Sequence, residues 1–442
     1  MSGTTSMTGR RLPRALTPFR HPAYRRLAIA LTLSTFASGV WVVALVWEVI
    51  RLGGGPAQLS LVATASSVGV LLPALLGGVV ADRIPQKLIL LVVAGVELTG
   101  MALVAVLSLT DSTTLWQLAA VSFVTGMGMA FYYPAYSAWL PALVPESDLL
   151  AVNGFEGMVR PTVGQAIGPA VAGAMVGAFS AGAAVTVAAS ASLLGLIALA
   201  TVPLTPVRRD FAAEGEPKHP VVSALIDMRE GFRFMVRTPW LLSTLLFASL
   251  MILVIMGPFE VLIPFLIKDR LDGGPSDHAV VLAAFGLGAA AGSLAMASMR
   301  MPRRYLTFMN LTWGIACLPL LVIGFATSVW QVVIAAFVIG VLFDAPMVIW
   351  GTLLQRRVPA HMLGRVASLD FFVSISLMPV SMAIVGPVSE AIGLQATFAI
   401  AAVAPIVFAV IAVLWGRLPQ DEIAHPLRDE DDAAEAAETV SV

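Results

Sequence analysis

Two copies of one sequence pattern make up most of this chain of 442 residues. The segment Arg51–Pro56 returns 219 positions later as Arg270–Pro275, and only one of its six residues differs. Further along, Glu156 recurs 214 positions on as Asp370, among several other matches. Solenoid repeats are far shorter, roughly 20–50 residues each. The repeat therefore predicts a protein built of two equivalent halves.

Each copy consists of apolar runs long enough to cross a bilayer. Apolar residues make up 58% of the chain and charged residues 12%, against roughly a quarter charged in soluble domains. A hydrocarbon core of ~30 Å needs about 20 apolar residues of helix. We predict an all-α membrane protein with twelve transmembrane helices in two pseudo-symmetric six-helix bundles. The predicted spans are Leu27–Ile50, Ala57–Val80, Leu88–Leu107, Leu115–Trp139, Val152–Phe179, Ala181–Val202, Trp240–Ile267, Val280–Met299, Leu306–Phe325, Val329–Leu353, Val366–Ala391 and Leu394–Trp415.

The spans divide the chain into four predicted regions. Residues 1–203 form the first bundle and residues 239–418 the second. Residues 204–238 form a cytoplasmic linker whose last part is an amphipathic helix, with Leu225, Met228, Phe232 and Met235 on one face. Such a helix is expected to lie on the inner leaflet. The acidic tail, residues 419–442, is expected to be disordered.

The positive charges predict the orientation, because cytoplasmic loops retain Lys and Arg. With a cytoplasmic N-terminus, 22 of the 26 Lys and Arg residues fall in cytoplasmic segments. Only Arg51, Lys268 and Arg270 lie outside, and Arg160 lies within a span. We predict a multi-pass protein of the cytoplasmic membrane with both termini inside. The first apolar run has no small-residue cleavage site and is expected to be retained.

Composition also excludes several classes of site. The formal net charge of −1 offers no polybasic surface for nucleic acid. A single cysteine, Cys317, rules out a disulfide framework and a cysteine-based metal site. The five histidines all fall outside the predicted spans, so no histidine is expected within the membrane. There is no P-loop sequence and no cluster of catalytic residues. We expect no enzyme activity, no metal, no cofactor and a monomer whose partners are the bilayer and a small molecule.

The loop between the second and third spans carries the sequence that identifies the family. Its residues Gly78, Asp82, Arg83 and Lys87 follow the spacing Gly-x-x-x-Asp-Arg-x-x-x-Lys. This resembles the signature of the major facilitator superfamily, although Pro85 and Gln86 replace its usual Gly and Arg. The resemblance implies the twelve-helix fold of that superfamily. It also implies that this loop braces the inner gate between the halves, with Asp82 beside a helix N-terminus.

The fifth span carries a second motif, formed by Gly164, Gly168, Pro169 and Gly173. It is similar to the antiporter motif of the drug-exporting branches, with Ala172 in place of one glycine. Small residues let helices approach closely, and a proline frees a carbonyl so that a helix can bend. Further stretches resemble the macrolide-efflux and enterobactin-exporter-like branch, namely Phe131–Pro134, Leu140–Asn153, Asp227–Phe234 and Leu354–Val366. This resemblance implies drug–proton antiport.

Ionisable residues within the spans are the candidate coupling and substrate residues. An ionisable side chain at mid-membrane costs at least ~2.5–3.5 kcal/mol on insertion scales. Each such residue is therefore expected to have a functional or structural role. In the superfamily the first, fourth, seventh and tenth spans line the central cavity, which implies that Glu260 and Asp344 face it. Glu156 and Arg160 are four residues apart and able to pair. For each residue the alternative is a structural contact with a neighbouring helix. The six candidates are Glu260, Asp344, Glu97, Glu156, Arg160 and Asp370.

These observations favour a secondary transporter that exports amphipathic small molecules, such as a drug, an antibiotic or a siderophore. Duplicated transporters bind their substrate between the halves and move by alternating access. Protons are the expected coupling ion, although carboxylates also bind Na⁺. Two alternatives remain at this stage. One is a proton- or sodium-coupled symporter that takes up a small nutrient, and the other is a membrane scaffold or sensor that transports nothing.

Overall fold

The fold is entirely helical in the part of the chain that can be described. The computed structural model describes residues 14–74, 80, 84–205, 220–359 and 362–427. No strand occurs among these residues. Within the described residues, ten helices are long and apolar enough to cross a membrane, judged by length and composition. The predicted all-helical membrane fold is confirmed.

The first half contains six predicted spans, and four of them are among those ten helices. The helix of the second span ends at Leu71 and is followed by a turn, before the undescribed residues 75–79. The fifth span is interrupted by a π-helical segment, η3. The elements are η1 (Arg14–Arg20), α1 (Pro22–Arg51), α2 (Pro56–Leu71), α4 (Gln86–Leu109), α5 (Leu115–Trp139), η2 (Leu140–Ala142), α6 (Glu146–Val159), η3 (Arg160–Ile167), α7 (Gly168–Ala178) and α8 (Ala181–Ala200).

The second half repeats this arrangement, with its own π-helical interruptions in the seventh span. A separate helix, α9 (Pro220–Arg237), precedes it. Helix α9 lies in the last part of residues 204–238, where the amphipathic pattern occurs. The remaining elements are α10 (Pro239–Gly257), η4 (Pro258–Leu262), α11 (Ile263–Phe265), η5 (Leu266–Arg270), α12 (Pro275–Ala297), α13 (Tyr305–Ala316), α14 (Pro319–Gly324), α15 (Val329–Arg357), α16 (Leu363–Ile375), α17 (Met378–Ile392), α18 (Leu394–Trp415) and α19 (Leu418–Ala424).

The repeated segments Arg51–Pro56 and Arg270–Pro275 form the same turn in both halves. In each turn the third residue has a left-handed backbone, with φ of 76° at Gly53 and 50° at Asp272. Glycine reaches this region without strain, and Asp is among the few other residues that tolerate it. This requirement explains why the single difference between the two copies is Gly to Asp. We call the end of the molecule with these two turns the turn end.

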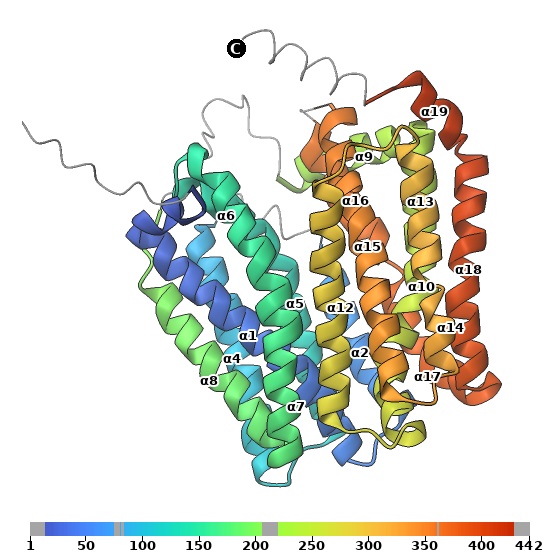
Figure 1. Cartoon of the computed structure of the whole chain (residues 1–442). Coiled ribbons are helices and arrows are strands. Elements are labelled where there is room, and N and C mark those ends of the chain that lie inside the picture. Colours follow the sequence, from blue (N-terminus) through green and yellow to red (C-terminus); the bar gives the residue numbers. More distant parts are fainter. Residues whose placement is uncertain (1–13, 75–79, 81–83, 206–219, 360–361, 428–442) are drawn as a thin grey trace, which may run out of the picture.

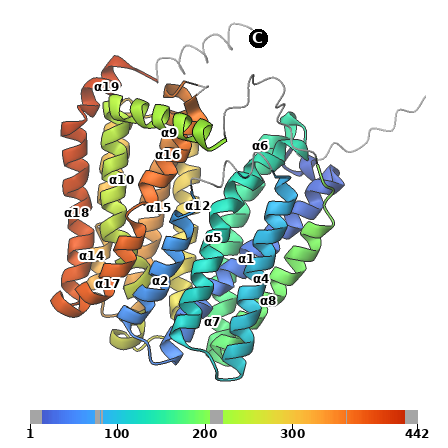
Figure 2. The same ribbon diagram turned by 180° about the vertical axis from the view of Figure 1, so that it is seen from behind.

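The opposite end carries α9 and α19, and we call it the linker end (Figures 1 and 2). Helix α9 packs against α10 and α16. Met235 is buried against them, whereas Phe232 is exposed. Met235 therefore packs against the second half, whereas Phe232 lies on an exposed side of α9. That α9 lies on the inner leaflet stays a prediction.

The predicted disorder of the acidic tail is wrong for its first residues, which form α19. Glu422 is buried, and its carboxylate accepts hydrogen bonds from the amides of Leu306 and Thr307 at 2.9 and 3.2 Å. It also accepts one from the Thr307 hydroxyl at 2.8 Å. The carboxylate thus satisfies amides at the start of α13, which have no partner within that helix. Composition alone predicted disorder because it contains no information on the contact between Glu422 and the start of α13.

The closest contacts between the halves lie toward the turn end. The Gly386 amide donates to the Ser60 hydroxyl at 3.0 Å and joins α17 to α2. The Ser276 hydroxyl donates to the Gly173 carbonyl at 3.4 Å and joins α12 to α7. Both views show α2, a first-half helix, beside α17 of the second half (Figures 1 and 2). The halves are thus held together at the end opposite to α9 and α19.

Candidate functional site

The predicted ionisable residues do not form one cluster. They separate into two accessible carboxylates without partners, two carboxylates that each join a pair of helices, and one carboxylate inside the first half. Within the described residues no group of three or more metal-binding side chains is found. The first group lies on η4 and α15, the second on α6 and α16, and the third on α4.

Glu260 and Asp344 are the two accessible carboxylates. Glu260 lies in the π-helical segment η4, which packs against both α17 and α2 and therefore touches both halves. Its side chain is exposed. Asp344 is half-buried near the middle of α15. Neither carboxylate has a hydrogen bond or ion pair with any described residue.

Glu156 joins α6 to α5. The Tyr136 hydroxyl donates to its carboxylate at 2.6 Å. Arg160, one turn further along, lies 3.5 Å from the other carboxylate oxygen. The guanidinium also donates to the Tyr133 hydroxyl at 3.2 Å and stacks over that ring at 5.0 Å from its centre. Hydrogen bonds and an aromatic face thus stabilise both charges of the pair.

Asp370 makes the equivalent contact in the second half, between α16 and α15. The Trp350 indole donates to its carboxylate at 3.0 Å, and the Ser374 hydroxyl donates at 3.3 Å. Trp350 and Ser374 stand 214 positions after Tyr136 and Arg160, the same offset that relates Asp370 to Glu156. The duplicated bond between an aromatic donor and a carboxylate was missed by sequence reasoning. The offset of 214 could have revealed this bond, because it relates Tyr136 to Trp350, two aromatic residues that can each donate a hydrogen bond.

Glu97 does not face the space between the halves. It is buried in α4 and lines a cavity of about 30 Å³ that is enclosed by α1, α4, α5 and α8. Glu97 therefore lies apart from Glu260 and Asp344, inside the first half, and its part in coupling stays a prediction. The polar groups that share this cavity are Ser34, Tyr132, Tyr136 and Ser192. No described residue donates a hydrogen bond to Glu97.

The glycines of the antiporter-like motif make two kinds of close contact. A Cβ atom on Gly168 would lie 2.9 Å from the Cα of Gly39, which shows that η3 and α7 pack tightly on α1. A Cβ atom on Gly173 would lie 2.8 Å from that of Ala279, so this glycine packs across to the other half. Gly164 contacts the Gly39 region, and Pro169 begins α7 directly after the π-helical segment. The motif therefore joins three helices near the turn end.

Most of the signature loop cannot be placed. Gly78, Asp82 and Arg83 lie outside the described residues. Lys87 is described, and its ammonium group donates to the carbonyl of Ala200 at the end of α8, at 2.8 Å. The predicted contact of Asp82 with the eleventh span stays a prediction.

One polar residue was wrongly placed by the sequence analysis. His278 lies in the first turns of α12, is buried, and its Nδ1 atom has no hydrogen-bond partner. The apolar run was predicted to begin at Val280, whereas the helix begins at Pro275. Helices often start with a few polar residues before the apolar pattern is established, which hid this histidine.

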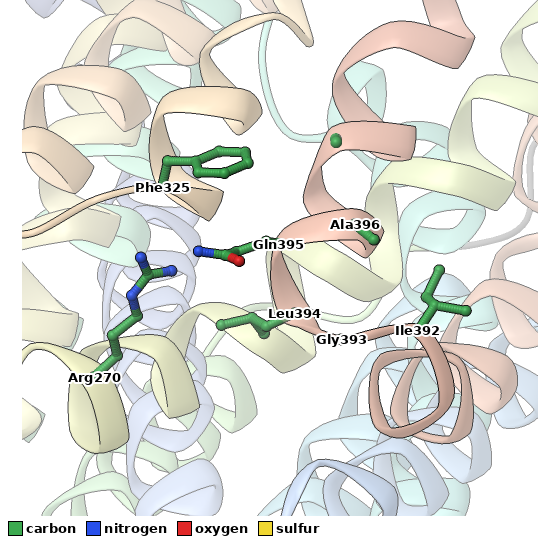
Figure 3. A pocket seen from close by; sticks show the side chains of 8 residues that line it. Arg270, Phe325, Ile392, Gly393, Leu394, Gln395 and Ala396 are labelled. Atoms are coloured by element: carbon green, nitrogen blue, oxygen red, sulfur yellow. The ribbon is translucent and has the colours of Figure 1, made fainter.

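A wide surface cavity lies at the turn end of the second half, away from all the predicted carboxylates (Figure 3). It has a volume of about 620 Å³ and is open to the surroundings. Arg270 and Gln395 point into it beside Phe325 and Leu394 (Figure 3). The Arg270 guanidinium also donates to the carbonyl of Gly324 at 2.7 Å. None of the predicted site residues that the structure describes lines this cavity.

The chain is similar to known membrane proteins in sequence and in fold. A family described as "Transmembrane secretion effector" matches residues 14–438. The chain is 26% identical to the multidrug efflux pump Tap of Mycolicibacterium fortuitum over 418 residues, which cover 92% of this chain and 98% of that protein. It is 23% identical to macrolide efflux protein A of Streptococcus pyogenes over 387 residues, with 86% and 92% covered. The crystal structure of the nucleoside transporter NupG superposes with a TM-score of 0.68 at 14% identity, covering 89% and 99%.

Proposed function

We infer the function from one premise: the chain belongs to the transmembrane secretion effector family of the major facilitator superfamily. It is accordingly a membrane transporter of the drug-efflux branch and not an enzyme. We propose that it exports amphipathic small molecules across the cytoplasmic membrane in exchange for protons. The relatives named as multidrug and macrolide efflux pumps support export of this class of compound.

The main support for this mechanism is the contact between the halves at the turn end. Glu260 lies in η4, which packs against α2 and α17, two of the helices in that contact. The distribution of Lys and Arg supports a cytoplasmic linker end. In that orientation the Gly386–Ser60 and Ser276–Gly173 bonds close the outer side. Rocking of the halves about these contacts would open the space between them to each side in turn.

Glu260 and Asp344 are the proposed coupling carboxylates. Glu260 is exposed and Asp344 half-buried, and neither has a cationic partner among the described residues. A carboxylate without a partner at membrane depth is costly, which marks it as a functional candidate. Binding a proton removes that charge, and losing the proton to the cytoplasm frees the carboxylate for the next cycle. The proton and the drug then compete for one site.

Purified protein in liposomes tests this mechanism, with a radiolabelled macrolide and ethidium as probes. Glu260→Gln and Asp344→Asn are each expected to lower accumulation driven by a pH gradient at least tenfold. Downhill exchange of the probe is expected to persist, since it needs no net proton movement. The matched control is Glu390→Gln, because Glu390 is an exposed carboxylate at the turn end of α17.

If both variants concentrate the probes as well as the wild type does, these carboxylates are not the coupling site. A sodium gradient at equal pH on both sides gives the second comparison. Accumulation driven by the sodium gradient alone would show that the coupling ion is Na⁺ and not the proton. Both termini are expected to be inaccessible to a protease added outside intact cells, and the purified protein is expected to be a monomer.

A further inference from the structure

The first half contains a polar path that includes neither Glu260 nor Asp344. Glu97 is buried, and its carboxylate has no partner among the described residues. Tyr132 and Tyr136 line the same cavity, and their rings stack with centres 5.7 Å apart. Tyr132 and Glu97 thus face one cavity from α5 and α4. Tyr136 then donates directly to Glu156 at 2.6 Å.

The cavity is large enough for water. Its volume of about 30 Å³ exceeds the ~10–15 Å³ that one water molecule needs, and the site offers several polar partners. Tyrosine hydroxyls donate and accept hydrogen bonds, so they can pass a proton along such a chain. At the far end, Glu156 and Arg160 are partly exposed, with 12% and 31% of their side chains accessible. The path therefore leads from the interior of the first half to its surface.

We propose that Glu97, Tyr132, Tyr136 and Glu156 form a proton relay, completed by water in the cavity. Glu97 gives its proton to the water, and the water passes one on to a tyrosine oxygen. Each tyrosine hydroxyl releases its own proton as it receives another. The last proton moves from Tyr136 to the Glu156 carboxylate, so one proton is lost by Glu97 and one is gained by Glu156. Neutral Glu156 then no longer holds Arg160 as an ion pair.

The second half supports this assignment because it keeps the bond but lacks the path. Trp350 replaces Tyr136, and an indole N–H donates a hydrogen bond but cannot accept one. Helices α4 and α13 begin 219 positions apart, whereas the following helix caps, Thr114 and Ser328, are 214 apart. These offsets place Ala316 or Leu311 opposite Glu97, and both are apolar. The Trp350–Asp370 bond therefore joins two helices without conducting protons. It provides a natural control for the first half.

Other titratable groups near Glu97 are few. Tyr24 on α1 is buried, and its hydroxyl has no hydrogen-bond partner. From α5 come Tyr132, Tyr133 and Tyr136, and beyond them lie Glu156 and Arg160. Helix α8 contributes only Ser192 to the polar lining of the cavity. No Lys or Arg lines the cavity to hold Glu97 as a permanent ion pair.

The test compares Glu97→Gln, Tyr136→Phe and the matched control Trp350→Phe, and it rests in part on the proposed antiport. In liposomes, the first two variants are expected to lose proton-driven accumulation at least tenfold and to keep downhill exchange. Trp350→Phe loses an equivalent helix-joining bond and is expected to keep its coupling. An equal loss in Tyr136→Phe and Trp350→Phe would mean that both bonds are only structural, which overturns the relay.

Infrared spectroscopy gives a readout that does not require transport. The carbonyl stretch of a protonated carboxylic acid should be present in the wild type and absent in Glu97→Gln. On transfer to D₂O, exchange of the acid proton for deuterium shifts this band to lower frequency. The exchange should be at least tenfold slower in Tyr136→Phe than in the wild type or Trp350→Phe. Equal exchange rates in all three proteins, or no band from Glu97, would overturn the relay even if antiport is confirmed. A normal relay signal in a protein that transports nothing would instead refute the antiport alone.

Discussion

A glycine in a membrane helix either lets another helix approach or faces free space, and the two cases predict different effects of substitution. A Cβ atom on Gly39 would lie 2.4 Å from the carbonyl oxygen of Gly164, a backbone atom that cannot move aside. A Cβ atom on Gly95 would have no neighbour within 4 Å. Both glycines lie within long helices, α1 and α4, so helix propensity affects them alike.

We therefore expect Gly39→Ala to destabilise the purified protein by about 1–3 kcal/mol, as overpacked cores do. Gly95→Ala is expected to be neutral or to stabilise by up to about 1 kcal/mol, because alanine is the better helix former. Thermal unfolding in detergent measures both. A melting temperature of Gly39→Ala at or above that of Gly95→Ala would contradict the tight packing of α1 on the fifth span.

At the scale of elements, α19 joins the last transmembrane helix to the start of α13. The Glu422 carboxylate carries this link through three hydrogen bonds, and Arg304 lies 3.6 Å away. Glu422→Ala would leave two amides of α13 unsatisfied, at a cost of about 1–3 kcal/mol. We expect a lower melting temperature for this variant. Glu390→Ala, at an exposed carboxylate, is the control and should melt as the wild type does.

Elements and contacts were not equally predictable from the sequence. Apolar runs set the spans, and the helix α9 followed from a 3.6-residue pattern. The cap made by Glu422, the burial of His278 and the Tyr136–Glu156 bond depend on residues far apart in the sequence, which periodicity does not relate. Glu97 shows the same limit. Its depth was predictable, but the cavity that it faces is created by four helices together.

At the scale of the whole molecule, the two repeated turns report the relative position of the halves. Spin labels at Leu52 and Leu271, which are equivalent in the repeat, should show a distance that lengthens when the turn end opens. The background variant Cys317→Ser removes the only cysteine. Labels at Leu52 and Ser112 lie in one half and should keep their distance. A Leu52–Leu271 distance that is unchanged with substrate and across pH would contradict alternating access by this motion.

The docking of α9 has a consequence for the order of synthesis. Glu230 and Gly231 of α9 contact Arg365 and Leu369 of α16, a helix made much later. At a ribosomal rate of ~5–20 residues per second, Arg365 follows Glu230 by roughly 7 to 27 seconds. During that interval the first half can fold alone, while α9 waits without its final partner. A nascent chain arrested before α16 would therefore expose the apolar side of α9 to lipid or to chaperones.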